Sequence, residues 1–198
     1  MDIQKVKKNL ERRGFEVRLF ENRRQAADYL VDSIRNTTVG TGGSMTLDAL
    51  DILDRLEETN TVYYRNRSKD IEDARRAMFA PVYLTSANGV SEDGEIVNID
   101  GAGNRVAAAA FDKEKLYYVI GVNKIVPTLA DAVERARNIA APLNARRLNR
   151  KTPCAAKADK CYGCHGAEGI CRNISITLGP MMSIKSVEVL IINEELGY

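Results

Sequence analysis

The residues with the clearest capacity for chemistry lie in one short segment, TPCAAKADKCYGCHGAEGIC at 152–171, which holds all four cysteines and the only histidine of the chain. The cysteines follow the spacing Cys154-x6-Cys161-x2-Cys164-x6-Cys171. Four thiolates in one loop can close a tetrahedral zinc site or hold an iron–sulfur cluster. Thiols that hold no metal would instead be free or bonded to each other. The choice between these states decides what kind of protein this is.

The spacing favours a [4Fe–4S] cluster. Zinc sites usually contain two close pairs of cysteines, and this segment contains one such pair, Cys161 and Cys164. A cluster that takes one thiolate at each of four irons tolerates the wider, near-symmetric spacing. Lys157, Lys160 and Arg172 would offset its negative charge. Structural zinc on the same cysteines is the alternative, and free or disulfide-linked thiols are a third interpretation.

A second chemical feature is VGTGGSMTLDAL at 39–50, a pattern typical of a strand, a glycine turn and a helix. Gly42 and Gly43 let the backbone approach a ligand, and the helix N-terminus behind them offers free N–H groups. Ser44 either caps that helix or contacts the ligand. We expect a phosphate or carboxylate there, although such a loop is also how a strand turns sharply into a helix. The loop is not a P-loop, because no Gly-Lys-Ser/Thr follows.

Polar residues at 85–105 form a third feature, because we expect them at strand ends and turns, where open α/β sheets bind ligands. Arg105 is the best candidate, since its planar fork matches a carboxylate or phosphate. Lys124, at the end of an expected strand, adds a second cation. The only histidine lies in the cysteine segment, so a general base elsewhere must be Glu92, Asp93, Asp100 or a lysine.

Helical and extended patterns alternate along the chain and predict an α/β fold with a mainly parallel, Rossmann-like sheet flanked by helices. Strands are expected at 15–20, 61–64, 82–88, 116–123, 174–178 and 187–192, with a β-hairpin between the third and fourth. Striped helices are expected around 27–34, 49–56, 71–79 and 132–143. We interpret 1–198 as one domain with an N-terminal helical segment at 1–38 and a C-terminal cysteine-rich loop, 152–172, inserted before the last strands.

The composition is that of an ordinary globular protein, with 44% hydrophobic and 28% charged residues. Lysine and arginine number 29 against 27 acidic residues, and this balance provides no basic footprint for nucleic acid. The basic pairs at 146–147 and 150–151 are interpreted as a solvated helix end. The polar N-terminus lacks a secretion signal, and no stretch approaches the roughly 18 apolar residues of a membrane span, so we expect a cytoplasmic protein. In that compartment clustered cysteines indicate metal or redox sites before disulfides.

Four stretches taken together resemble the lactate utilization (LUD) family. They occur in the family's order from about Val39 to the C-terminus, and they are VGTGGSMTLDAL, TSANGVSEDGEIVNIDGAGNRVAAAAF, VIGVNKIVPTLADAVERARNIAAPLNARRL and the cysteine pattern TPC…KC…C…IC. The resemblance implies a fold like that of glucosamine-6-phosphate deaminase, ribose-5-phosphate isomerase and the CoA transferases. It also implies a role in oxidising lactate to pyruvate, in a bacterial complex with iron–sulfur partners.

In that fold the ligand lies where the glycine loop meets the strand ends. The resemblance therefore implies a site in this chain made of Gly42, Gly43, Ser44, Asn88, Glu92, Asp100, Asn104 and Arg105. Of these we expect Glu92, Asp100 and Arg105 to be catalytic. We expect the others to bind a small carboxylate or phosphate-bearing ligand together with Lys124.

Larger family members carry paired C-x2-C-x2-C-x3-C ferredoxin motifs, which this chain lacks. Lactate gives up two electrons and a lone cluster accepts one at a time, so we expect iron–sulfur or flavin partner subunits. The resemblance in fold also implies a homodimer. The alternative function is a free-standing sugar-phosphate or acyl-CoA-type enzyme or sensor with structural zinc on the four cysteines.

Overall fold

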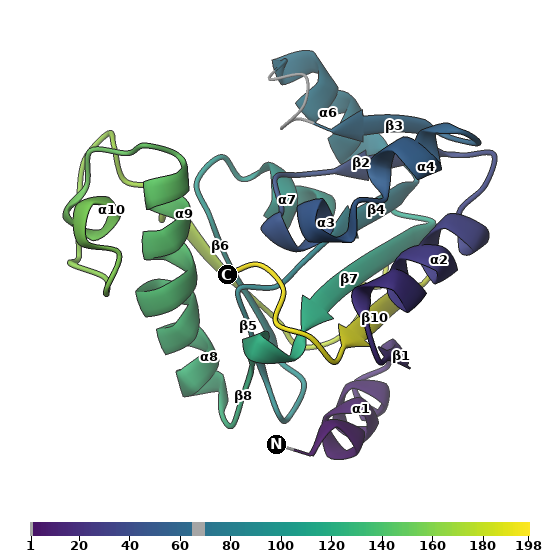
Figure 1. Ribbon diagram of the computed structural model, residues 1–198, viewed down its shortest axis with the longest axis horizontal. Helices are drawn as coiled ribbons and strands as arrows, with labels where there is room; N and C mark the ends of the chain where they lie inside the picture. The colour runs from purple at the N-terminus through teal and green to yellow at the C-terminus, as the bar shows by residue number, and fades with distance from the viewer. Residues whose placement is uncertain (1, 65–69) are drawn as a thin grey trace.

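The computed structural model describes residues 2–64 and 70–198. In this part of the chain the main element is a sheet of six strands, all of them parallel (Figure 1). In spatial order its strands are β1 (Glu16–Phe20), β10 (Val187–Ile192), β7 (Lys115–Gly121), β4 (Val82–Thr85), β2 (Thr38–Thr41) and β3 (Thr61–Tyr64). The predicted α/β fold with a mainly parallel sheet is confirmed.

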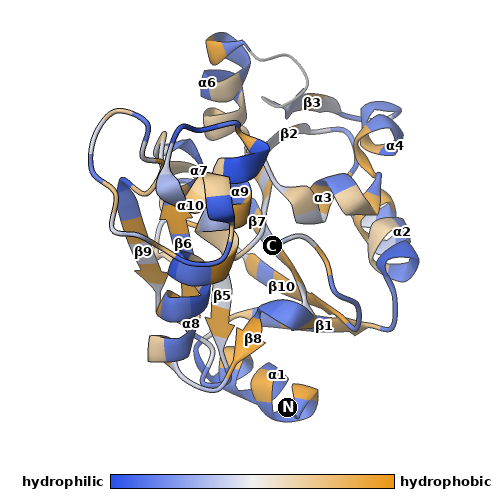
Figure 2. Ribbon diagram, turned by 60° about the vertical axis from the view of Figure 1, so that its left-hand side comes forward, coloured by the Kyte–Doolittle hydropathy of each residue, from blue (hydrophilic) through white to orange (hydrophobic). Residues whose placement is uncertain are grey.

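The central strands are buried on both faces, which explains their nearly continuous apolar sequences. Their side chains alternate between two hydrophobic clusters. Tyr83, Tyr118 and Val189 belong to one cluster, and the residues that follow each of them belong to the other. Figure 2 shows hydrophobic residues concentrated in the strands and hydrophilic residues on the outer faces of the helices.

Helices cover both faces of this sheet. Those that contribute to the first cluster are α1 (Ile3–Arg12), α6 (Ile71–Phe79) and α7 (Asn104–Ala108). Those that contribute to the second are α2 (Arg23–Ser33), α3 (Met45–Leu50) and α4 (Leu53–Glu57). The stripe at 49–56 was expected to form one helix, but it is broken at Asp51, whose φ of 50° is left-handed. Aspartate adopts this conformation more easily than most residues.

A second, smaller sheet stands beside the first. Its strands, in spatial order, are β8 (Ile125–Val126), β5 (Gly89–Ser91), β6 (Ile96–Asp100) and β9 (Asn173–Thr177). The predicted hairpin forms the antiparallel pair β5–β6. The strand predicted at 174–178 pairs antiparallel with β6 and so belongs to this sheet.

The helix predicted around 132–143 covers the small sheet, but it has three parts. They are α8 (Leu129–Arg135), a π-helical turn (Ala136–Ala140) and α9 (Ala141–Arg147). Pro142, the second residue of α9 and two residues after the π-helical turn, has no N–H to donate to the helix. Ala132, Ala136 and Ala141 pack against Val97 and Ile99 of β6. Small residues at these positions let the helix lie close to the sheet.

The cysteine segment begins with α10 (Pro153–Lys157), which packs against α9. Ala145 of α9 shares a small apolar cluster with Cys154, and Tyr162 and Ile170 pack against it. Arg146 donates hydrogen bonds to the backbone oxygens of Ala155 and Ala156, at 3.0 and 2.8 Å. The segment is thus attached to α9 at the far end of the small sheet from α1 (Figure 1).

Candidate functional site

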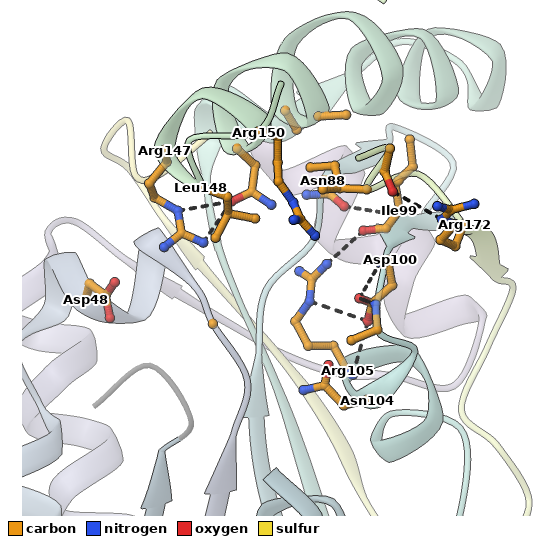
Figure 3. Close-up of a pocket in the computed structure, with 18 of the residues that line it drawn as sticks. Asp48, Asn88, Ile99, Asp100, Asn104, Arg105, Arg147, Leu148, Arg150 and Arg172 are labelled. Atoms are coloured by element: carbon orange, nitrogen blue, oxygen red, sulfur yellow. Dashed lines mark hydrogen bonds and ion pairs between the residues drawn. The ribbon is translucent and has the colours of Figure 1, made fainter. Parts of the chain in front are cut away.

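A cavity of about 940 Å³ opens where the carboxyl ends of β2 and β3 face α9 and the cysteine segment. Gly43 of the glycine loop and Tyr64 of β3 line one side of it. The turn from β6 into α7 lines the floor, and the end of α9 lines the opposite side (Figure 3). The cysteine segment forms the remaining wall through Ala167, Gly169, Ile170 and Arg172. Such an edge, outside the carboxyl ends of parallel strands, is where open α/β sheets bind ligands.

Asp100 holds the floor of the cavity in place. Its Oδ1 accepts hydrogen bonds from the backbone N–H groups of Gly101 and Ala102, at 2.7 and 3.3 Å. Its Oδ2 accepts from those of Arg105 and Val106, at 3.1 and 3.3 Å. A carboxylate has about four lone-pair sites. The oxygens of Asp100 are therefore occupied by the turn that positions Arg105.

Arg105 connects the floor with the glycine loop. Its Nη2 donates to the backbone oxygen of Ile99 at 2.7 Å, and its Nε lies 3.5 Å from Oδ2 of Asp100. A Cβ on Gly42 would lie 2.4 Å from Cγ of Arg105, so only glycine lets this side chain cross the loop. The predicted meeting of the glycine loop and Arg105 is what the structure shows.

The remaining residues of the expected ligand set are divided between the cavity wall and the layer beneath it. Asn88 and Asn104 line the cavity. Asn88 is held by its Oδ1, which accepts the N–H of Ile99 at 2.8 Å. Ser44 caps α3 by accepting the N–H of Leu47 at 3.3 Å, and it lies outside the cavity lining.

Lys124 lies beneath the cavity and is 3% exposed. Its ammonium donates to Oγ1 of Thr46, Oγ of Ser86 and the backbone oxygen of Ala87, at 2.7, 2.9 and 3.0 Å. Burial lowers the pKa of this lysine to about 7, and the nearby Arg135 and Arg105 contribute. The three bonds tie α3 to the end of β4, so Lys124 supports the glycine loop from below.

Glu92 is remote from the cavity. It follows β5, and its carboxylate pairs with Lys5 of α1 at 3.1 Å. The backbone oxygen of Glu92 also accepts a hydrogen bond from the side chain of Asn9 at 2.9 Å. The structure therefore brings Asp100 and Arg105 together but leaves Glu92 at the surface toward α1.

Three arginines that line the cavity were not expected there. Arg147 and Arg150 come from the basic pairs interpreted as a solvated helix end, and Arg172 directly follows the last cysteine. Oδ1 of Asn144 accepts hydrogen bonds from both Nε and Nη2 of Arg147, at 3.0 and 2.9 Å. Arg147 ends α9 and Arg150 lies beyond the helix, so helical spacing gave no signal for this pair. Which face would be solvated depends on how α9 packs.

The four thiols come close together. Cys154 is buried, Cys171 is exposed, and all four are free. Burial and the three other cysteines raise the pKa of Cys171 to about 11, and burial together with Cys154 and Cys161 raises that of Cys164. The backbone N–H of Gly163 donates to Sγ of Cys161 at 3.4 Å.

Within the described residues, no three histidine, cysteine or acidic side chains stand in position to ligate a metal ion. Four thiols in one segment are nonetheless the soft donors that zinc and iron–sulfur centres take, and an N–H group points at one of the sulfurs. Gly163 and Gly166, with φ of 61° and 111°, have open space where a Cβ would be. The segment therefore has donor groups of the type that such a centre requires.

The fold and this cavity define the protein as an open parallel α/β domain with an arginine-lined cavity at the carboxyl ends of its strands. More particularly, the chain belongs to the LUD domain family, whose model matches residues 3–192. A crystal structure of a DUF162 family protein from Deinococcus radiodurans is similar with a TM-score of 0.55, 11% identity, and coverage of 96% of this chain and 95% of that one. That likeness shows the fold. None of the curated proteins matches the chain. Among the described helices, none is long and apolar enough to cross a membrane.

Proposed function

We propose that this LUD-domain chain binds a small carboxylate in the arginine-lined cavity and holds a [4Fe–4S] cluster on Cys154, Cys161, Cys164 and Cys171. In this proposal it is a subunit of an NAD-independent system that oxidises lactate to pyruvate. Family membership and the cysteine spacing support the proposal.

One observation carries this proposal: the cysteine segment is itself a wall of the cavity. Ile170 and Arg172, on either side of Cys171, both line the cavity. The N–H of Arg172 donates to the backbone oxygen of Asp100 at 3.0 Å. A Cβ on Gly101 would lie 2.7 Å from the oxygen of Ile170, so the two backbones touch. A redox centre on the cysteines would therefore lie next to a ligand bound at Arg105.

The residues of the chain have the chemistry to bind and orient a carboxylate. The guanidinium of Arg105 offers a charged fork, and the amides of Asn88 and Asn104 are neutral groups on the same cavity wall. The carboxylates that line the cavity, Asp48 and Asp100, already accept hydrogen bonds from Tyr64 and from the α7 turn. We therefore assign binding to this chain and the removal of the hydride and proton to a partner.

The cluster would supply one-electron transfer. Oxidation of lactate to pyruvate releases two electrons and two protons. A flavin partner would take both electrons with the hydride, and this cluster or that of an iron–sulfur partner would accept them from the flavin one at a time. Because the reaction needs such a partner, we propose that the chain is a subunit of a larger complex. The homodimer that the resemblance in fold implies is a separate prediction.

The first test is metal and sulfide analysis of protein purified without oxygen. We expect about four irons and four sulfides per chain and a broad brown absorption. Cys161→Ser/Cys164→Ser should lose both, while His165→Ala, an exposed neighbour in the same segment, should keep them. Stoichiometric zinc with no iron would overturn the cluster.

The second test is isothermal titration of lactate into the same protein. Arg105→Gln should weaken lactate binding by at least about tenfold, because it removes a charged bidentate partner. A control variant, Arg12→Gln, removes the same charge from an exposed position on α1. Equal affinity in the two variants would overturn the assignment of Arg105.

One observation favours the second candidate function, a free-standing enzyme or sensor for a phosphate-bearing ligand with structural zinc. Among the described residues, four arginines line the cavity, which exceeds what one carboxylate requires. Zinc in the metal analysis together with phosphate-ester binding would select this candidate.

A further inference from the structure

We propose that Arg147 and Arg150 form a second anion subsite in the cavity, so that the preferred ligand is a phosphorylated 2-hydroxy acid. The carboxylate would bind at Arg105 and the phosphoryl group at the end of α9. This inference rests on the proposed function for the Arg105 subsite and names the substrate class of the same cavity. A simple 2-hydroxy acid such as lactate fills only the inner half.

The first argument is the charge of the lining. Four arginines and two carboxylates line the cavity within the described residues. Figure 3 shows the guanidinium groups of Arg150 and Arg105 pointing toward one another from opposite sides. Two like charges that face each other across an open space repel. A separate anionic group bound beside each guanidinium would offset that repulsion.

The second argument is the partners of the outer arginines. Both recorded hydrogen bonds of Arg147 go to the neutral amide oxygen of Asn144. The carboxylate that Arg150 approaches is that of Glu168, 4.0 Å away, at the margin of an ion pair. Arg105 differs, because Asp100 lies at 3.5 Å. The charge of the outer pair is therefore less compensated than that of the inner arginine.

The third argument is preorganisation. Asn144 lies one helical turn before Arg147 and holds two of its nitrogens, so the guanidinium is already fixed on the cavity side. A fixed planar fork loses little side-chain entropy when it binds an oxyanion. Arg150 is 41% exposed and Arg105 19% exposed. The subsite at Arg147 and Arg150 is thus the outer, accessible end of the cavity.

The fourth argument is size. Cavities that enclose a whole small molecule measure roughly 300–1,000 Å³, and this one, at about 940 Å³, is near the upper limit. Lactate has only six non-hydrogen atoms and one charged group. Among the described lining residues only Tyr64 is aromatic, whereas four are arginines, so the lining favours anionic groups over an aromatic base. A short chain with an anionic group at each end matches this lining better than a nucleotide does.

The test compares lactate with 3-phosphoglycerate, which is lactate with a phosphorylated hydroxymethyl group in place of its methyl group. Titrations use the full chain purified without oxygen, at fixed ionic strength, with inorganic phosphate as a third probe. We expect 3-phosphoglycerate to bind at least about tenfold more tightly than either lactate or phosphate, because only it reaches both subsites.

Arg147→Gln/Arg150→Gln should remove this advantage and leave lactate affinity unchanged. Arg150→Gln alone, at an exposed position, should remove part of it without threatening the fold. The matched control is Lys151→Gln, which removes one positive charge beside Arg150 from a residue outside the cavity lining. If Lys151→Gln weakens the binding of 3-phosphoglycerate as much as Arg150→Gln does, general electrostatic attraction explains the affinity, and the second subsite is overturned.

The outcomes separate this inference from the proposed function. Tight lactate binding with no gain from the phosphate would overturn the second subsite and keep the Arg105 site. Binding of 3-phosphoglycerate that depends on Arg147 and Arg150, with no measurable lactate binding, would support the subsite and overturn lactate as the substrate. Failure of all three probes to bind would overturn both.

Discussion

Two groups of cations lie near the carboxyl ends of the same strands, and their surroundings differ. Lys124 and Arg135 are buried, and every hydrogen bond of theirs recorded in the structure goes to a hydroxyl or backbone oxygen. Arg147 and Arg150 lie in an open cavity with an amide and a distant carboxylate.

A buried cation is tolerated only when its donors are satisfied. Lys124 bonds to Thr46, Ser86 and Ala87, and Arg135 bonds to the backbone oxygens of Asn88 and Asn123. The hydrogen-bond donors of these two cations therefore hold the strand ends together. Arg147 and Arg150 line an open cavity, where a ligand can reach them. The comparison teaches that position alone does not distinguish a structural cation from a binding one, whereas the partners of each cation do.

The largest expected effect comes from deleting the buried amine. Lys124→Ala removes three hydrogen bonds and leaves a cavity among α3, β4 and β7, so it should lower the free energy of unfolding by about 2–4 kcal/mol. Chemical denaturation measures this. Arg150→Gln and Lys151→Ala should each change it by less than about 0.5 kcal/mol, because both residues are exposed. Comparable losses of unfolding free energy in the Lys124 and Arg150 variants would contradict the distinction between structural and binding cations.

A smaller effect is expected at the contact between the glycine loop and Arg105. Gly42→Ala places a Cβ 2.4 Å from Cγ of Arg105 and should cost about 1–3 kcal/mol of stability. It should also weaken anion binding, because the guanidinium must move. In an Arg105→Ala background the same change should cost clearly less, and a double-mutant cycle measures the coupling. Additive losses would show that the clash with Arg105 is not the cause.

The third effect, which is the smallest when taken over a single pH unit, is a pH dependence. The folded-state pKa of Lys124 is lowered to about 7, from an ordinary value of 10.5. Between these values the unfolded chain binds more protons than the folded one, so the contribution of Lys124 to stability rises with pH, by at most about 1.4 kcal/mol per pH unit. The difference in unfolding free energy between the wild type and Lys124→Met should therefore grow in favour of the wild type from about pH 7 upward. A difference that stays constant with pH would mean that the amine keeps its ordinary pKa.

The local sequence was sufficient for most of the elements. The strand VEVLII lies at 187–192 as expected, because a continuous apolar run of that length suits a strand buried on both faces. The meeting of Gly42 with Arg105 was also predictable, since both residues follow strands whose carboxyl ends meet at one edge. Asp51 and Pro142 divide helices that periodicity alone would join, because each alters one backbone position without changing the apolar pattern.

The site was less predictable where it depends on contacts between distant segments. Glu92 looked like a candidate base in the sequence, but α1 packs beside it and supplies Lys5 as its partner. Asp100 looked equally free, and its oxygens accept four backbone N–H groups. Arg147 and Arg150 looked solvated, but Arg147 at the end of α9 and Arg150, which follows the helix, both line the cavity.

The sequence by itself determined the parallel α/β class, the glycine loop, the cysteine spacing and membership of the LUD domain family, because each is written in residues close together along the chain. Only the tertiary structure decided which cations hold the fold together through buried hydrogen bonds and which line the cavity. It also decided that the cysteine segment lies against the ligand wall. Those outcomes depend on burial and on partners separated by tens of residues along the chain, and a local pattern carries no information about either.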